Sequence, residues 1–472
     1  MTWIRSRSMA PTAARTRLSV EGMEDRSVPA ALALNGLFDP IRVDRPTAAN
    51  VYTETNNPAE GLNAVLGFHR AADGSLTQFG KFATGGTGQL NLPKAIGPDD
   101  GDQQVQVTDD GKFLFAVNQG SDSVSSFRVR ANGRLDLVGA FATGGDQPDS
   151  IGIAGNRVYI ANRGDASNTH PGTTVPGVTG FDIGANGALT PIANSTVHFP
   201  VGTLATQTLV SPDGRFLFVE VGTLAGVAGG NTVNAFQIKG DGSLVAAPGG
   251  PASAGTNAPF LLGAAAHPTL NIVYTGFASA KQVGVFSYDE TGRTNFVGAA
   301  ADSGAAPCWC VVSADGRVLY VANTGTNTLG VFSLADPLHP VQIQDIPLGG
   351  PRSLDGTPTG PRAQAFEIAL DPTGRFLFAV TQASDPSFPQ GNQLHTLTIA
   401  RDGTLTERTA PVIFSQSDVP ANAHPQGLAV IATPAHRGTN DYRDFRIGQR
   451  FAAFDFGEDS RESNPVRSRS TR

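Results

Sequence analysis

Two cysteines flank a tryptophan in the stretch PCWCVV, residues 307–312, and the chain has no other cysteine. Two thiols this close could form a strained redox pair, or could give a metal ion two of the four ligands it needs. In an extended strand Cys308 and Cys310 would share one face and Trp309 would lie on the other. Because buried cysteine behaves as a small apolar residue, we predict a core strand, in which Trp309 packs between strands or floors a pocket.

Two further side chains are candidates for acid–base chemistry. Glu220 lies in FVEVG, where related segments of the chain have alanine, so an acid occupies an apolar strand. Burial would raise its pKa and suit it to act as a general base, with a hydrogen-bonded structural acid as the alternative. His170 lies in a long insertion, residues 164–178, of a kind that often binds ligands, although a lone histidine is commonly structural.

Other motifs for chemistry are weak or absent. Asp99, Asp100 and Asp102 could ligate calcium, but their spacing does not match an EF-hand loop, and a solvated turn is predicted. The sequence has no histidine pair at metal-binding spacing, no GxSxG, no P-loop, and no GxGxxG after a strand. We therefore expect no metal and no cofactor.

Composition and net charge restrict the kinds of partner that the chain is expected to bind. The formal net charge is -7 and the chain contains 56 glycines and 32 prolines among 472 residues, which is typical of many short turns. An acidic chain offers no basic face for nucleic acid, and no apolar run is long enough for a transmembrane segment. The expected partners are a small molecule, such as a lactone or a saccharide, and a protein or component of the cell envelope, bound by a monomer.

A repeated turn-and-strand unit organises the chain. TDDGKFLFAVNQG at 108–120 returns as SPDGRFLFVEVG at 211–222, SADGRVLYVANTG at 313–325 and DPTGRFLFAVTQ at 371–382. A second glycine turn follows most copies, and LADPLHP at 334–340 replaces it once. Asp-Gly and Asn-Gly suit tight hairpins, and the alternating apolar residues suit strands buried on both faces. The pattern predicts an all-β, seven-bladed β-propeller of four-stranded antiparallel blades.

The two ends of the repeat predict how the ring closes. The first unit, from residue 51, lacks a preceding strand, and HPQGLAVIA at 424–432 supplies one, so the C-terminal strand should complete blade one. The expected domains are a leader and linker at 1–47, the propeller at 48–432 and a disordered tail at 433–472. LSVEGMEDRSVPA resembles a leader of exported bacterial proteins, which predicts a location in the cell envelope or outside the cell.

The repeats resemble the lactonase family of seven-bladed propellers, which includes 6-phosphogluconolactonase, carboxymuconate cyclase and secreted relatives of unassigned substrate. The resemblance lies in YTETNNPAEGLNAVLGFHRAADGSL, in two copies of FATGG, in VNQGSDSVSSFRV and in PCWCVVSADG. It implies hydrolysis of a sugar or aromatic lactone at the central channel. The chain lacks the Pro-Arg-His that opens inner strands in enzymatic members, which favours the alternative of an exported, non-catalytic propeller that binds a ligand, saccharide or protein at a ring face.

The candidate site residues follow from this resemblance and from the expected inner strands. The catalytic candidates are Arg362, Glu367, Glu220 and His170. The candidates for ligand binding along the channel wall are Gln104, Asp149, Gln207, Trp309 and Gln426.

Overall fold

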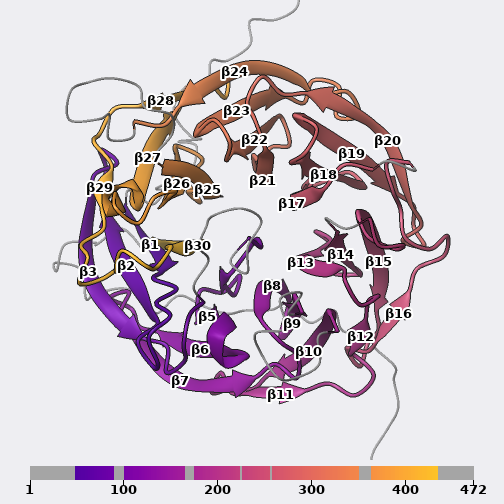
Figure 1. Cartoon of the computed structure of the whole chain (residues 1–472), viewed down its shortest axis with the longest axis horizontal. Coiled ribbons are helices and arrows are strands. Elements are labelled where there is room, and N and C mark those ends of the chain that lie inside the picture. Colours follow the sequence, from indigo (N-terminus) through magenta and orange to yellow (C-terminus); the bar gives the residue numbers. More distant parts are fainter. Residues whose placement is uncertain are drawn as a thin grey trace, which may run out of the picture. The chain divides into compact units, whose positions relative to one another are not determined.

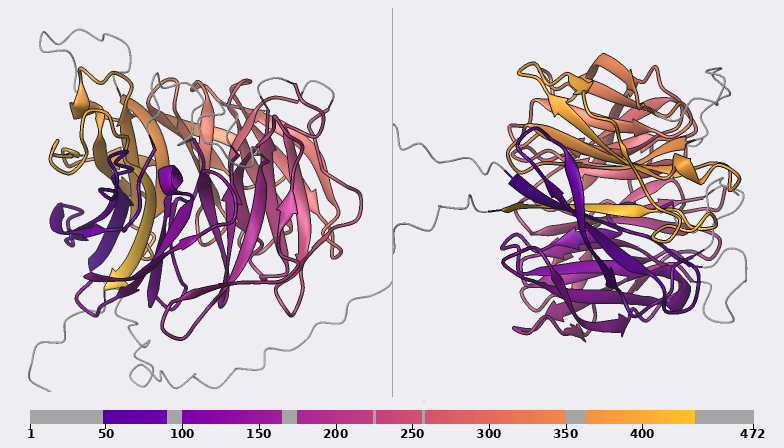
Figure 2. Two further views of the ribbon diagram at one scale, coloured as in Figure 1. Left: turned by 60° about the horizontal axis from the view of Figure 1, so that its bottom comes forward. Right: turned by 90° about the vertical axis from the view of Figure 1, so that its left-hand side faces the viewer.

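The computed structural model describes residues 48–89, 100–164, 175–223, 226–255, 258–349 and 363–433, which form a ring of seven antiparallel sheets (Figure 1). The predicted seven-bladed β-propeller is therefore confirmed. Blades 2 to 7 have four strands in chain order from the axis outward, blade 1 has the C-terminal strand as its innermost, and blades 3 and 7 have one additional short strand paired to their third strand. Side views show the strands running from one face of the ring to the other (Figure 2).

The strands of blades 1 to 4, from the axis outward, have the following bounds. Blade 1 contains β30 (Gln426–Thr433), β1 (Ala48–Glu54), β2 (Ala64–Arg70) and β3 (Leu76–Ala83). Blade 2 contains β4 (Val105–Val107), β5 (Phe113–Asn118), β6 (Ser123–Val129) and β7 (Leu135–Ala142), with the short helix η1 (Gln119–Ser121) after β5. Blade 3 contains β8 (Pro148–Ala154), β9 (Arg157–Asn162), β10 (Gly177–Ile183), β11 (Leu189–Pro191) and β12 (Val197–His198). Blade 4 contains β13 (Leu204–Val210), β14 (Phe216–Gly222), β15 (Thr232–Ile238) and β16 (Leu244–Ala246).

Blades 5 to 7 follow the same order. Blade 5 contains β17 (Leu261–Ala266), β18 (Ile272–Phe277), β19 (Gln282–Tyr288) and β20 (Thr294–Ala301). Blade 6 contains β21 (Pro307–Val312), β22 (Val318–Asn323), β23 (Thr328–Ser333) and β24 (Val341–Pro347). Blade 7 contains β25 (Ala363–Leu370), β26 (Phe376–Ala383), β27 (Gln393–Ile399), β28 (Leu405–Glu407) and β29 (Val412–Ile413), with η2 (Pro389–Gly391) before β27.

The ring closes as the sequence predicts, because β30 pairs with β1 and places Thr433 opposite Ala48. A buried ion pair at the same junction joins blade 1 to blade 7, with Arg70 Nη2 at 3.0 Å from Asp371 Oδ2. The apolar side chains between neighbouring blades form the core, as Val51 and Phe68 of blade 1 do with Phe378 of blade 7. Closure thus buries two blade faces that an open ring would expose to water.

The two faces of the ring are built differently. The turn face contains the glycine turns, where Gly111 and Gly133 have φ of +66° and +82°, values that L side chains rarely adopt. The Tyr52 hydroxyl donates to the Gly133 carbonyl of the next blade at 2.7 Å, so these turns also join blades. The opposite face, called the loop face here, is where each innermost strand begins. Register irregularities near the start of β8, β13, β17, β21 and β25 turn side chains there toward the axis.

Both cysteines are buried in a strand, as the sequence predicts. Cys308 and Cys310 lie in β21, are 4% and 3% exposed, and are not joined in a disulfide. Burial raises the pKa of the Cys310 thiol well above its usual value. The prediction that the two cysteines share one face is wrong, because the register is irregular between Pro307 and Cys310. Cys308 packs in the same apolar cluster as Trp309, and Cys310 packs in a different one.

Candidate functional site

A short stretch of the chain, Gly101–Gln104, lies across the ring axis and is called the axial segment here. Besides blade 2, into which it leads, its backbone bonds to four blades. The contacts are Trp309 Nε1 to Gly101 O at 2.5 Å, Asp102 N to Thr206 O at 3.3 Å, Gln103 N to Glu367 Oε1 at 2.8 Å, and Ile151 N to Gln103 O at 3.1 Å. Asp100 and Asp102 are only 4% and 5% exposed. The prediction of a solvated turn is therefore wrong for these two residues, because the loop turns into the ring.

The axial segment places two carboxyl groups together. The carboxyl groups of Asp102 and of Glu367 in β25 lie close enough to interact, and both side chains are buried. Burial raises the pKa of Asp102 to about 7, and burial together with the Asp102 charge raises the pKa of Glu367. Two buried acids in contact cannot both be ionised at low cost. These shifts indicate that one of the two carboxyl groups is protonated near neutral pH, so the pair contains a carboxyl and a carboxylate.

Two more glutamates face the inner strands from the second strands of blades 1 and 4. Glu54 lies opposite Gln426, and Glu220 lies opposite Gln207. Burial raises the pKa of Glu54 and of Glu220 to about 8. The raised pKa expected for Glu220 is thus confirmed, and Glu54 is an equivalent acid that the sequence argument missed. Comparing YTETN at 52–56 with FVEVG at 218–222 would have revealed it.

The two glutamines opposite these acids have different hydrogen-bond partners. Gln426 Nε2 donates to Glu54 Oε1 at 2.5 Å, whereas Gln207 Nε2 donates to the carbonyl of Ala264 at 2.9 Å and its oxygen accepts from the Ala264 N–H. Gln207 therefore continues backbone pairing from blade 4 to blade 5. Glu220, left without its glutamine, accepts a hydrogen bond from Thr275 of blade 5.

The remaining wall candidates are also buried at the axis. Gln104 and Asp149 are fully buried, and the Trp309 ring lies 3.9 Å from the Phe366 ring between centroids. Asp149 Oδ1 accepts from Gln119 Nε2 at 2.5 Å, and Gly101 packs against the same carboxylate so closely that a side chain there would clash. The structure thus places the seven described candidates on or next to the inner strands, without exposing them to solvent.

Arg362 and His170 lie outside the described residues, so their predicted roles stay predictions. A residue that the sequence argument missed is Arg163, which follows β9 and is 5% exposed. Its Nε lies 3.9 Å from Asp149 Oδ2. The signal was an arginine in ANRGD at the place where VNQGS has Gln119.

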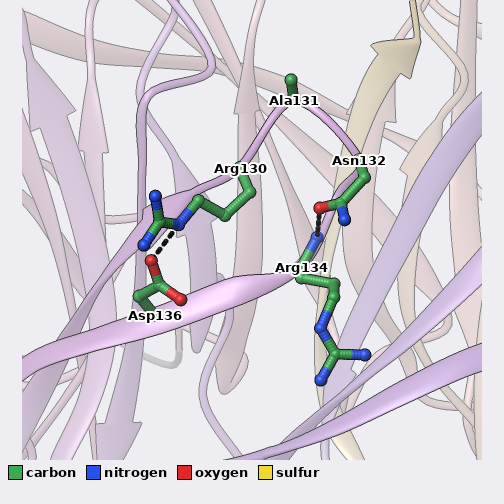
Figure 3. Close-up of a pocket in the computed structure, with 5 residues that line it drawn as sticks. All are labelled: Arg130, Ala131, Asn132, Arg134 and Asp136. Carbon is green, nitrogen blue, oxygen red and sulfur yellow. Dashed lines mark hydrogen bonds and ion pairs between the residues drawn. The ribbon is translucent and has the colours of Figure 1, made fainter.

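Two pockets on the surface lack a comparable group of buried ionisable side chains. One is lined by Arg130, Ala131, Asn132, Arg134 and Asp136 of the turn between β6 and β7 (Figure 3). Arg130 is paired with Asp136 and the Arg134 side chain points away from both, so the two guanidinium groups do not converge on one ligand (Figure 3). The other pocket, on the loop face between blades 1 and 2, is lined by Pro58, Ala59, Thr87, Gly88, Gln89, Gly120 and Asn422.

No three His, Cys, Asp or Glu side chains come together in the described ranges in a way that could hold a metal ion. In the same ranges we find no helix that is both long and apolar enough to span a membrane.

Comparison with known proteins gives a family and several structural likenesses. The family model described as lactonase, 7-bladed beta-propeller matches residues 60–171 and 219–386, which together are more than half of the chain. No curated protein matches. The periplasmic gluconolactonase PpgL of Pseudomonas aeruginosa has 21% identity and a TM-score of 0.58, over 82% of this chain and 100% of that one. A putative 6-phosphogluconolactonase from Bacteroides fragilis has 18% identity and a TM-score of 0.58, over 83% and 100%. At these identities the solved structures show the shared fold.

Proposed function

Because the chain belongs to the lactonase family of seven-bladed β-propellers, we propose that it hydrolyses a sugar or aromatic lactone at the loop-face half of its axis. The observation that supports this most is the Asp102–Glu367 pair. A carboxyl and a carboxylate next to each other near neutral pH are the acid and the base that ester hydrolysis needs.

The proposed reaction uses both members of the pair. The carboxylate takes a proton from water as the water oxygen bonds to the lactone carbonyl carbon. When the bond from that carbon to the ring oxygen breaks, the protonated carboxyl gives its proton to the departing ring oxygen. Atoms balance as lactone plus water to hydroxy acid, and the pair exchanges which member holds the proton. Among the earlier catalytic candidates, this keeps Glu367 as a member of the acid–base pair with Asp102, and leaves Glu220 in its bond to Thr275.

A second function is supported by a different observation. The axial segment already bonds to Glu367 Oε1, to Trp309 Nε1 and to the carbonyl of Thr206, where a bound ligand could otherwise bond. An axis filled by its own chain supports a propeller that binds a ligand, saccharide or protein on a ring face without turnover. The leader-like segment LSVEGMEDRSVPA and the periplasmic description of PpgL are compatible with export, which suits either function.

The experiment is hydrolysis of a panel of neutral sugar lactones and aromatic lactones by the full chain, followed by acid release at constant pH. Glu367→Gln and Asp102→Asn should each lower kcat/KM by about 10²-fold or more. Glu290→Gln, an exposed acid on the turn face, is the matched control and should have no effect. Wild-type rates equal to buffer across the panel, together with a ligand that raises the Tm, would favour the binding function.

A further inference from the structure

Arg163 is a buried cation with few partners. Its side chain is 7% exposed, and among the described residues its ion-pair partner is Asp149, whose Oδ2 lies 3.9 Å from Nε, which is too long for a hydrogen bond. The Nε atom is buried without a hydrogen-bond partner in the described part of the chain. A guanidinium has five N–H donors, and a buried charge is costly unless its donors are used.

Arg70, which is also buried, has more hydrogen-bond contacts among the described residues than Arg163. Arg70 Nη2 lies 3.0 Å and 3.2 Å from the two oxygens of Asp371, Nη1 donates to the Ala71 carbonyl at 3.2 Å, and the guanidinium lies 4.9 Å from the Phe376 ring centroid. Arg70 thus holds two blades together through bonds from both of its Nη atoms. Arg163, at the loop-face end of its strand, forms no such Nη bond to any residue in the described ranges.

Asp149 is held away from Arg163 by its other neighbours. Its Oδ1 is bound by Gln119 at 2.5 Å, and Gly101 of the axial segment packs against its carboxylate. The carboxylate is therefore fixed between the axial segment and the arginine. The arginine keeps N–H groups for an oxygen ligand beside the segment that positions Asp102.

We propose that Arg163 binds the carbonyl oxygen of the lactone and, after ring opening, the carboxylate of the hydroxy acid product. A planar guanidinium matches a carboxylate through two parallel N–H···O bonds, and it stabilises negative charge on a carbonyl oxygen as water attacks. The role in the reaction rests on the proposed lactonase function. Binding of a hydroxy acid carboxylate does not, so the two can be tested separately.

The test measures binding of D-gluconate, a simple hydroxy acid probe, to the full chain by calorimetry and thermal shift. Gluconate should bind wild type, and Arg163→Met should weaken that binding by about 10-fold or more, with Arg163→Lys in between because lysine cannot bind in a bidentate way. Arg157→Met is the matched control, since Arg157 begins the same strand at the turn face and is paired with Asp182 at 3.1 Å. Glucitol, which lacks the carboxylate, should show no dependence on Arg163.

The outcomes separate the two proposals. If Arg163→Met lowers the rate of lactone hydrolysis by about 10²-fold while Arg157→Met does not, both stand. If no lactone is hydrolysed but gluconate binding depends on Arg163, the lactonase function fails and the carboxylate site stands. Hydrolysis or gluconate binding that is indifferent to Arg163, or a wild type that does not bind gluconate, overturns this inference. Should Arg163→Met not fold, Arg163→Lys gives the same comparison.

Discussion

The pKa values of carboxyl groups are lowered on the turn face and raised around the ring axis. On the turn face, hydrogen bonds from Lys112 and Thr108 lower the pKa of Asp110 to about 2. At the axis, burial raises the pKa of Glu54 and Glu220 to about 8. The same chemical group is therefore held ionised at one face by donors two residues away in its own turn. At the axis it is held protonated by residues from distant parts of the chain that exclude water.

One acid combines features of both regions. Asp371 lies in the DPTG turn on the turn face, yet its side chain is fully buried and its partner Arg70 is 301 residues away. In the related turns the order is reversed, and Ser211 donates to the exposed Asp213. Exchanging the two residue types along the turn places the acid inward, where Thr373 of its own turn donates to it and Arg70 of blade 1 supplies the opposite charge.

The largest expected effect is a loss of stability when the ion pair between Arg70 and Asp371 is removed. Arg70→Met leaves the Asp371 carboxylate buried without its cation and should lower the free energy of unfolding by about 3–5 kcal/mol, measured by urea denaturation. Adding Asp371→Asn should restore much of the loss. Arg317→Met removes an exposed pair at 3.9 Å and serves as the control, with a change below about 1 kcal/mol. A loss in Arg70→Met no larger than in this control would contradict the closing role of the pair.

The axis acids should make stability depend on pH. Because Glu54 and Glu220 have a raised pKa in the folded chain, the unfolded chain releases these protons first as pH rises from about 4.5 to about 8. Their contribution is fully present below the unfolded pKa and is lost across that window. The Tm should therefore be higher at pH 5 than at pH 8, and Glu220→Gln should raise stability at pH 8 by about 2 kcal/mol while flattening the profile. An unchanged profile in Glu220→Gln would show that the acid is ionised in the fold.

The turn-face acids should give the smallest effect, with the opposite dependence. Hydrogen bonds from Ser243 and Thr404 lower the pKa of Asp241 and Asp402, so their contribution is present above the unfolded pKa and lost as pH falls through the folded value. Asp241→Ala should lower the Tm by less than about 2 °C at pH 7, and the difference should vanish near pH 2. Calorimetry over this range measures both. A Tm difference that persists at acid pH would instead indicate loss of turn geometry.

Local repetition made much of the fold predictable. Glycine turns at a regular interval predict the hairpins, the missing strand of the first unit predicts the pairing of β30 with β1, and LADPLHP at 334–340 correctly stands for a glycine-free turn between β23 and β24. Glu220 could be found because it departs from a repeat. These features depend on residues close together in the chain, whose geometry is set by backbone dihedral preference and by alternation of apolar side chains.

The contacts at the ring axis could not be predicted from such local patterns. The sequence by itself determined seven blades, their turns, the closing strand and one buried acid, because each is encoded in a short segment. Only the tertiary structure decided that Gly101–Gln104 crosses the ring, that Asp102 meets Glu367 from 265 residues away, and that Arg163 faces Asp149 at 3.9 Å. Those contacts arise where seven blades converge and water is excluded. Burial there depends on every blade at once, so no local pattern in the chain records it.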